Sequence, residues 1–336
     1  MPHTLPLIRA AAISPMRRWV EENGRDPAVF LTKADLDWVP RNDPYLPIPL
    51  RRVVQLLVEI SREAGADAPH RIVNGRGGHE IGLIGAAAFC GPTVRDGFRK
   101  LSQTMPIHCT HEVFTIAELE DGLHIRDGWA YDLGDDETLH LVQQYVASLV
   151  DMICSVAHGS IPCVDRVALV PHPEAGLSHL RPWLGEAARP AEDRALDITL
   201  LDGVAEAHFP DTVRKAALED VAHDYGPLPK GRSLSDQVAM LVGSMLSRTT
   251  PSVDRIAVAA NVSGRTLRRS LQREGTSFSD VVERTRARIA LDRLRSETGT
   301  SLKAIASDLG YANQATLSRA VKRWTGHTPR SIRAGR

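Results

Sequence analysis

The sequence lacks a long hydrophobic segment. Its longest apolar run, Ile81 to Cys90, is well short of the roughly 20 residues that a membrane-spanning helix requires. The first twelve residues also lack the basic region, apolar core and small-residue cleavage site of a secretory signal. We therefore expect a cytoplasmic protein that has no membrane partner.

Cysteine is scarce and is not arranged in pairs. The chain has four cysteines, namely Cys90, Cys109, Cys154 and Cys163. None of them forms the C-x-x-C spacing that many structural metal sites and redox centres share. In a cytoplasmic protein we expect all four thiols to be reduced.

Motifs that carry catalysis or bind metals are also lacking. The chain contains neither G-x-S-x-G nor H-E-x-x-H. His108 and His111 have no further ligand pair nearby in the sequence, and we interpret them as incidental. Other histidines are scattered and are expected to be unpaired: His124, His140 and His158. The sequence therefore predicts no metal, no cofactor and no enzymatic activity.

The whole chain has no net charge, but its two parts carry opposite net charges. The formal net charge is zero, yet residues 233–336 hold 18 Lys and Arg against 8 Asp and Glu, whereas residues 1–232 hold 23 against 33. The two parts thus carry net charges of +10 and −10. Cations gain affinity for nucleic acid by displacing counterions from phosphates, although a solvated basic face would show the same asymmetry. The spacing of residues must decide between these interpretations.

The length of 336 residues predicts at least two domains, and prolines and glycines mark a boundary at residues 225–231. We predict an α+β domain at 1–225, a linker at 226–232 and a helical domain at 233–336. The apolar patterns of the first domain predict helices at 47–62, 93–103 and 136–158, and strands at 113–119, 123–129, 167–170 and 196–201.

Three short segments of the first domain have simple interpretations. Gly122 is expected to supply the positive φ angle of a hairpin between 113–119 and 123–129. The segment Asn74 to Gly78 lacks the pattern of a phosphate-binding loop and is interpreted as a turn. The apolar segment Ile81 to Phe89 is interpreted as helix core rather than as the wall of a pocket.

The second domain contains an internal repeat with a period of about fifty residues. Ile256-Ala257 and Ile305-Ala306 open two copies of a short helix, a tight turn and a second helix. Two copies are too few for a solenoid. The sequence instead predicts helix-turn-helix units at 250–272 and 301–324.

N-capping residues and glycines set the bounds of these helices. Thr250-Pro251 offers a cap and a first helical residue for the first unit, and Ser263 caps its second helix, which Gly275 ends. Ser301 and Asn313 have the same role in the second unit. Between the units, Ser277 and Asp280 predict a capping box that opens a helix of about 27 Å, comparable to the ~34 Å between successive major grooves on one face of DNA.

The second helix of each unit has an apolar side and a polar arc. With Leu267 and Leu271 facing inward, the first polar arc comprises Arg265, Arg268, Arg269 and Gln272. With Leu317 and Val321 facing inward, the second polar arc comprises Gln314, Ala315, Ser318, Arg319 and Lys322. Arginine pairs with guanine, glutamine pairs with adenine, and alanine contacts the thymine methyl group in the major groove. Both arcs are therefore predicted to bind DNA.

Two arginines have alternative roles. Arg268 either contacts a base or forms a surface ion pair with Asp254 or Glu274. Arg333, in a final short helix that Thr328-Pro329 caps, is expected to contact phosphate or to have a structural role.

These residues resemble the C-terminal domain of AraC/XylS-type regulators over about a hundred residues. The motifs are Arg265-Thr-Leu-Arg-Arg269, Gly275-Thr-Ser-Phe278 and Ile305-Ala-x-x-Leu-Gly-Tyr311, continuing through Arg319, Gly326, Thr328-Pro329 and Arg333. The resemblance implies that the two polar arcs are the DNA-contacting positions. Leu317 and Val321 stand where the family usually has phenylalanines, so the packing of this helix is expected to differ. The N-terminal region looks like an effector-binding domain of the same family.

The sequence thus predicts a DNA-binding transcription regulator. Its expected partners are double-stranded DNA, RNA polymerase, a small-molecule effector, which the resemblance implies, and a second copy of the chain in a homodimer. Two alternatives remain for residues 1–225: a module that only dimerises or docks a protein, without ligand, and a catalytic domain fused to the DNA-binding domain.

Overall fold

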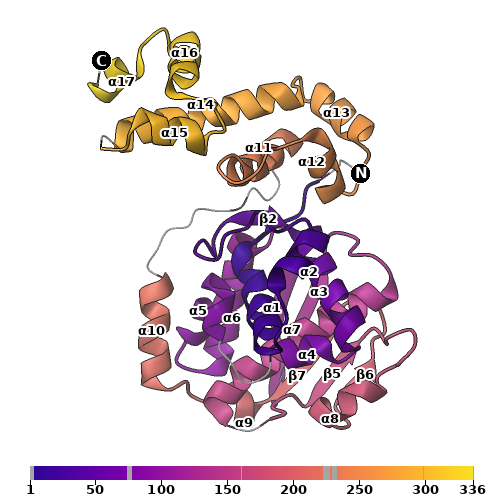
Figure 1. Cartoon of the computed structure of the whole chain (residues 1–336). Helices are drawn as coiled ribbons and strands as arrows, with labels where there is room; N and C mark the ends of the chain where they lie inside the picture. Colours follow the sequence, from indigo (N-terminus) through magenta and orange to yellow (C-terminus); the bar gives the residue numbers. More distant parts are fainter. Residues whose placement is uncertain are drawn as a thin grey trace. The chain divides into compact units, whose positions relative to one another are not determined.

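The computed structural model describes residues 4–73, 78–159, 161–221, 228, 233–297 and 299–335 (Figure 1). The chain divides into two compact units. The N-terminal unit comprises Pro6–Leu46 and Leu50–Lys230, and the C-terminal unit comprises Met1–Leu5, Pro47–Pro49 and Gly231–Arg336. Apart from buried Leu228, the predicted linker lies outside the described residues. The predicted turn at Asn74 to Gly78 also lies outside them, except for its last residue.

A five-stranded sheet with the strand order β3-β4-β7-β5-β6 organises the N-terminal unit. The strands are β3 (Glu112–Glu118), β4 (Gly122–Trp129), β5 (Arg166–Leu169), β6 (Ala188–Pro190) and β7 (Leu196–Leu201). Neighbouring strands are antiparallel except for β5 and β6, which are parallel. Burial alternates along β3 and β4, so one face of the sheet covers the core.

The predicted hairpin is confirmed, but Gly122 has a different role from the predicted one. Glu118 pairs with Leu123 across the turn. Gly122 does not have a positive φ angle. A Cβ atom at this position would overlap the carbonyl oxygen of Leu200 on the neighbouring strand. Glycine is therefore needed because two backbones approach each other closely.

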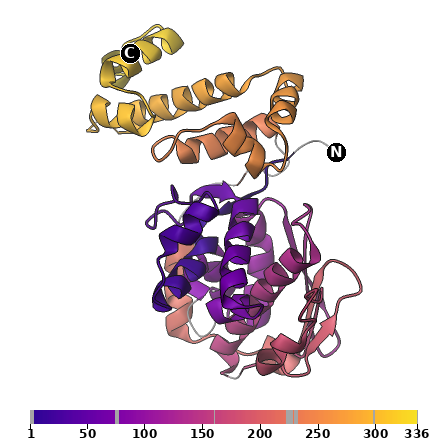
Figure 2. The same cartoon turned by 45° about the vertical axis from the view of Figure 1, so that its right-hand side comes forward.

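Helices cover the core-facing side of this sheet (Figure 2), with α6 against β3 and α7 against β5 and β7. The helices are α1 (Ser14–Glu22), α2 (Pro27–Lys33), α3 (Leu50–Ala64), α4 (Ala68–Val73), α5 (Leu83–Phe89), α6 (Val94–His108), α7 (Asp136–His158), α8 (Arg181–Leu184), α9 (Asp202–Ala205) and α10 (Asp211–Val221). Short 3₁₀ turns are η1 (Ala10–Ile13), η2 (Gly78–Ile81) and η3 (Ser178–Leu180). The predicted α+β class of this part is confirmed.

Helix α7 has the bounds that the sequence predicts. The Asp135 side chain caps its first turn, and Gly159 ends it with a φ angle of +78°. Among the described residues, α7 is the one helix that is long and apolar enough to cross a membrane. Most of its apolar segment is buried inside the N-terminal unit, as in the core helix of a soluble protein.

The predicted helix at 47–62 is wrong at its start. Pro47–Pro49 forms strand β2, and β1 is Leu7–Arg9. Two prolines fix their own φ angles, and a residue before a proline is driven into an extended conformation. Helix α3 therefore begins only at Leu50.

Seven helices and strand β2 lie in the described part of the C-terminal unit. The helices are α11 (Leu234–Met245), α12 (Val253–Ala259), α13 (Gly264–Arg273), α14 (Phe278–Ser296), α15 (Leu302–Asp308), α16 (Gln314–Thr325) and α17 (Pro329–Arg333). Helices α12 and α13 lie at one end of α14, and α15 and α16 lie at its other end (Figure 1). The backbone N–H of Leu5 donates a 2.7 Å hydrogen bond to Gln237 on α11, which anchors the start of the chain.

Most of the predicted caps in this unit are confirmed. Ser263 and Ser301 cap α13 and α15, and Ser277 and Asp280 form the complete capping box of α14. The predicted cap at Thr250 is wrong, because the Ser252 side chain accepts from the backbone N–H of Arg255 and α12 begins one residue after Ser252.

Candidate DNA-binding face and ligand pocket

The first polar arc lies on the exposed side of α13. Leu267 and Leu271 on the opposite side are completely buried. The four arc residues are all exposed: Arg265, Arg268, Arg269 and Gln272. Ser263 and Gly275 fix where this helix starts and ends, since the serine side chain accepts from the N–H of Thr266 and the glycine has a φ angle of +73°. The arc therefore stands on a helix whose inner face is held by the core.

The three arginines of this arc have no acidic partner within ion-pair distance among the described residues. Within the described part of the chain, none of Arg265, Arg268 and Arg269 forms an ion pair. The Glu274 carboxylate instead accepts hydrogen bonds of 2.9 Å from the backbone N–H groups of Leu234 and Ser235, at the start of α11. The alternative role of Arg268, an ion pair with Glu274 or Asp254, is thus not formed among these residues.

The second polar arc occupies the corresponding side of α16. Asn313 caps this helix through a 2.9 Å hydrogen bond from the N–H of Thr316, and Leu317 and Val321 are completely buried. The arc residues Gln314, Ala315, Arg319 and Lys322 are exposed, and Ser318 is half-buried. Smaller aliphatic residues thus fill the inner face of α16 where the resemblance had suggested phenylalanines.

Arginines that the sequence did not single out hold the second helix pair on α14. Arg286 donates a 3.0 Å hydrogen bond to the carbonyl oxygen of Leu309 and lies 5.1 Å from the centre of the Tyr311 ring. Arg293 pairs with Asp308 at 2.6 Å and with Glu297 at 3.1 Å. The contacts with Leu309, Tyr311 and Asp308 join residues far apart in the sequence, so no local pattern indicates them.

Arg333 makes a structural contact. One nitrogen of its half-buried guanidinium group donates to the carbonyl oxygen of Thr300, in the segment between α14 and α15. This hydrogen bond ties α17 to the start of the second helix pair.

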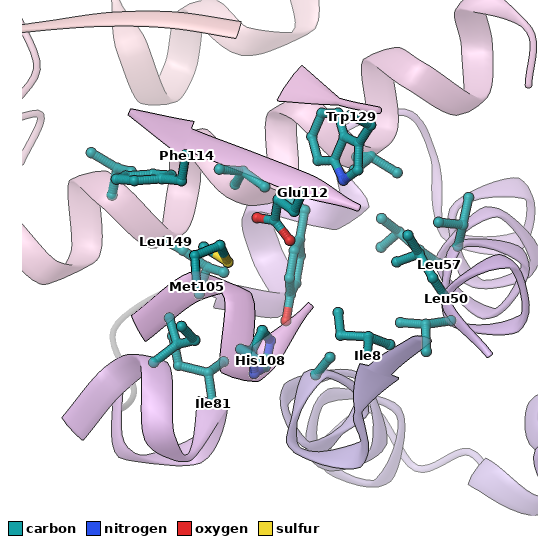
Figure 3. Close-up of a pocket in the computed structure, with 18 of the residues that line it drawn as sticks. Ile8, Leu50, Leu57, Ile81, Met105, His108, Glu112, Phe114, Trp129 and Leu149 are labelled. Atoms are coloured by element: carbon teal, nitrogen blue, oxygen red, sulfur yellow. The ribbon is translucent and has the colours of Figure 1, made fainter. Parts of the chain in front are cut away.

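A cavity of about 100 Å³ lies inside the N-terminal unit (Figure 3). Elements from β1 to α7 contribute to its wall, which is largely aliphatic and aromatic. Its lining residues include Ile8, Leu50, Leu57, Ile81, Ile84, Met105, Phe114, Trp129 and Leu149, together with His108, Glu112 and Tyr145. Ile81 and Ile84 belong to the segment interpreted as helix core. They are buried, but they also line this pocket.

Three polar side chains face this apolar space, and all three are more than nine-tenths buried: His108, Glu112 and Tyr145. Burial raises the pKa of the Glu112 carboxyl to about 7. Burial, and secondarily the positive charge of Arg9, lowers the pKa of His108 to about 3, so its ring is neutral at pH 7. His108 Nδ1 and the Tyr145 hydroxyl have no hydrogen-bond partner among the described residues.

The expectation that the other histidines are unpaired is wrong. His124 Nε2 lies 2.9 Å from Asp197 on the neighbouring strand. His140 Nε2 lies 3.0 Å from His179 Nε2, and its Nδ1 lies 2.7 Å from the carbonyl oxygen of Val170. Strand pairing and helix packing create these pairs, so no local sequence signal indicates them. The four cysteines form no disulfide, as expected.

Comparisons with known proteins relate both units to transcription regulators. A family model described as a helix-turn-helix domain matches residues 256–335. The HTH-type transcriptional regulator VirS of Mycobacterium tuberculosis is 25% identical, with 98% of this chain and 96% of that protein covered.

Two solved structures are also similar. The transcriptional regulator CdpR of Pseudomonas aeruginosa is 16% identical with a TM-score of 0.42, covering 95% of this chain and 96% of that one. A transcriptional regulator of Chromobacterium violaceum, described as containing an AraC-type DNA-binding domain, is 27% identical with a TM-score of 0.27, covering 30% and 88%.

Proposed function

We propose that the chain is an AraC/XylS-type DNA-binding regulator of transcription, that its two polar arcs contact the bases of one operator, and that a small molecule in the N-terminal pocket controls this binding. The observation that carries the DNA-binding part is the shared design of α13 and α16. Each helix buries two aliphatic residues completely and exposes arginine and glutamine on the other side.

The chemistry of the two arcs favours contact with different bases. Arg265, Arg268 and Arg269 suit guanine, because an arginine donates two parallel hydrogen bonds to its O6 and N7 atoms. Gln314 suits adenine, and the neighbouring Ala315 suits a thymine methyl group. The two helix pairs are thus proposed to act as two helix-turn-helix modules with different preferences.

The length of α14 supports binding to two neighbouring grooves. Its 19 residues span about 28 Å at about 1.5 Å per residue. The next major groove on the same face of DNA is about 34 Å away. Side chains of α13 and α16, at the two ends of α14, extend this span. Arg333 holds α17 in place, and the basic charge of the unit supplies affinity for phosphates.

The pocket supports control by a ligand rather than a module that only dimerises. Ligand sites are concave, mostly apolar and furnished with a few polar groups, and the cavity around Glu112 has these properties. RNA polymerase and a second copy of the chain are the further partners that we propose for a regulator of this type.

Selection of binding sites from random DNA by the full-length chain tests the DNA-binding proposal. We expect two blocks of preferred bases about one helical turn apart. Gln314→Ala should relax the preference within one block and leave the other unchanged, because each arc contacts its own groove. Ser235→Ala, in the first turn of α11 and outside both arcs, is the control and should leave both blocks intact. A single block, or a Gln314→Ala change spread over both blocks, would contradict the proposal.

A further inference from the structure

We propose that the pocket of the N-terminal unit binds a small organic cation, a primary amine on a short apolar body, with its ammonium group against Glu112. This inference deepens the proposed ligand control, and it rests on that proposal only for the effect of the ligand on DNA binding. Three features of the pocket support it: its size and walls, the two buried carboxyl groups Glu112 and Asp127, and the lack of a basic group among its described lining residues.

The size and walls of the cavity set the body of the ligand. Its volume of about 100 Å³ is smaller than the engineered cavity of about 150 Å³ that holds benzene. The wall is built mainly from aliphatic side chains such as Leu57 and Ile84, with aromatic rings at Phe114 and Trp129. An apolar group of about four carbons therefore fits this space and gains free energy by leaving water.

Glu112 lines the cavity, and a second buried carboxyl group, Asp127, lies next to it on the neighbouring strand. Glu112 lines the cavity on β3, and its strand partner is Trp129. Asp127 pairs with Phe114, so it is the diagonal neighbour of Glu112 on the same inward face of the sheet. Asp127 is completely buried, and neither of its carboxylate oxygens has a hydrogen-bond partner among the described residues. A protein rarely buries such groups unless something pairs with them.

The polar groups in the wall match the hydrogen atoms of an ammonium group. An ammonium group has three N–H donors and no acceptor. Glu112 offers carboxyl oxygens, and Tyr145 offers a hydroxyl oxygen without a partner among the described residues. His108 accepts through Nδ1 in the tautomer that carries its proton on Nε2. Figure 3 shows Glu112 and His108 on the wall of the same cavity. The faces of the nearby aromatic rings attract a cation further.

The same wall disfavours anions. None of the described lining residues is lysine or arginine. His108 is neutral at pH 7 because burial lowers its pKa to about 3. A carboxylate or phosphate group would therefore meet Glu112 without a basic side chain among the described lining residues to compensate its charge. A neutral alcohol would satisfy some of the hydrogen bonds but would not pair with the carboxylate.

Three probes of similar size test the inference on the full-length chain: n-butylamine, n-butanol and butyrate. Isothermal titration calorimetry at pH 8 should show n-butylamine binding at least tenfold more tightly than the other two, because hydrogen bonds to charged groups are the stronger ones. Equal or tighter binding of n-butanol or butyrate overturns the inference, and so does a lack of binding by all three.

Variants locate the contact. Glu112→Gln should reduce the affinity for n-butylamine at least tenfold and remove its advantage over n-butanol, whereas the control Glu120→Gln, an exposed change of the same kind in the hairpin turn, should not. Asp127→Asn should also weaken binding of the amine, and it serves as the test if Glu112→Gln does not fold. An amine preference that survives both variants overturns the inference. Binding of the amine without any change in DNA affinity upholds it and contradicts ligand control.

Discussion

The carboxyl group of Glu112 is buried, and the pairing of β3 with β4 makes Asp127 its diagonal neighbour. Its side chain faces the core from β3, and burial raises its pKa to about 7. The groups that face it are Cys109 and His108 at the end of α6, Asp127 on β4 and Tyr145 on α7. The folded protein binds the Glu112 proton more tightly than the unfolded chain does. The contribution of Glu112 to the free energy of unfolding therefore falls as pH rises.

The pH dependence of stability should therefore change in Glu112→Gln. Between about pH 4.5, the usual value, and about pH 7, the folded state binds more protons at Glu112 than the unfolded state does. The free energy of unfolding of the wild type should fall with rising pH, relative to the variant, across this window. Chemical denaturation of both proteins at several pH values measures the difference, in which titrating groups that do not interact with Glu112 cancel. A constant difference from pH 4.5 to pH 7 would show that Glu112 titrates normally.

Replacing Arg268 and replacing Arg333 should weaken DNA binding in different ways. Arg268→Ala should cost about 1 to 3 kcal/mol on the selected operator and relax the preference at one base position. Arg333→Ala removes the hydrogen bond to Thr300 and should weaken binding to all sequences about equally. Site selection and affinity measurement with each folded variant separate the two outcomes. If Arg268→Ala keeps every base preference, Arg265 and Arg269 remain as the guanine-contacting candidates.

Among the elements, those with local signals were predictable. Asn313 and Ser263 mark helix starts because a side-chain oxygen next to the first turn satisfies a free N–H, whatever lies elsewhere in the chain. The bounds of α7 follow from its own caps and periodicity. For β2, Pro47 and Pro49 indicate an extended segment, but its strand pairing could not be predicted in this way, because pairing depends on a partner distant in the sequence.

The pocket could not be predicted for the same physical reason. Its wall combines side chains from Ile8 to Ile153, which only the fold brings together. A buried carboxyl at Glu112 has the same local sequence pattern as an exposed one. The polar arcs were easier, because two buried leucines four residues apart on α13 determine which side of that helix is exposed.

The capping box of α14 gives a test at the scale of one element. Ser277→Ala removes the hydrogen bond to the N–H of Asp280 and should destabilise the C-terminal unit by about 1 kcal/mol. Ser296→Ala, at the other end of α14, is the matched control. Its hydroxyl donates back to the carbonyl oxygen of Asp292, and such a bond does not stabilise a helix, so its loss should have little effect. Urea denaturation compares the two, and equal losses would show that the box does not hold α14.

At the scale of the whole molecule, the pocket and the polar arcs lie in different units of one chain, so control by a ligand must be a coupling between two separate sites. Thermodynamic linkage makes such a coupling reciprocal. If n-butylamine changes the affinity of the chain for its operator by some factor, saturation with operator must change the affinity for n-butylamine by the same factor.

We expect a coupling of about 5- to 150-fold, the usual range for allosteric proteins. Calorimetric titration of n-butylamine into the full-length chain, with and without the operator obtained by site selection, measures one side of the cycle. Titration of that DNA with and without the amine measures the other side. In Glu112→Gln both coupling factors should approach one, because n-butylamine then binds the free chain and the operator-bound chain with similarly weak affinity. The control Glu120→Gln should keep both factors at their wild-type values. A coupling factor that stays unchanged in Glu112→Gln would show that the amine acts outside this pocket or at the DNA-binding face itself. If both coupling factors are one while n-butylamine still binds, the chain is a DNA-binding regulator whose pocket does not control DNA binding.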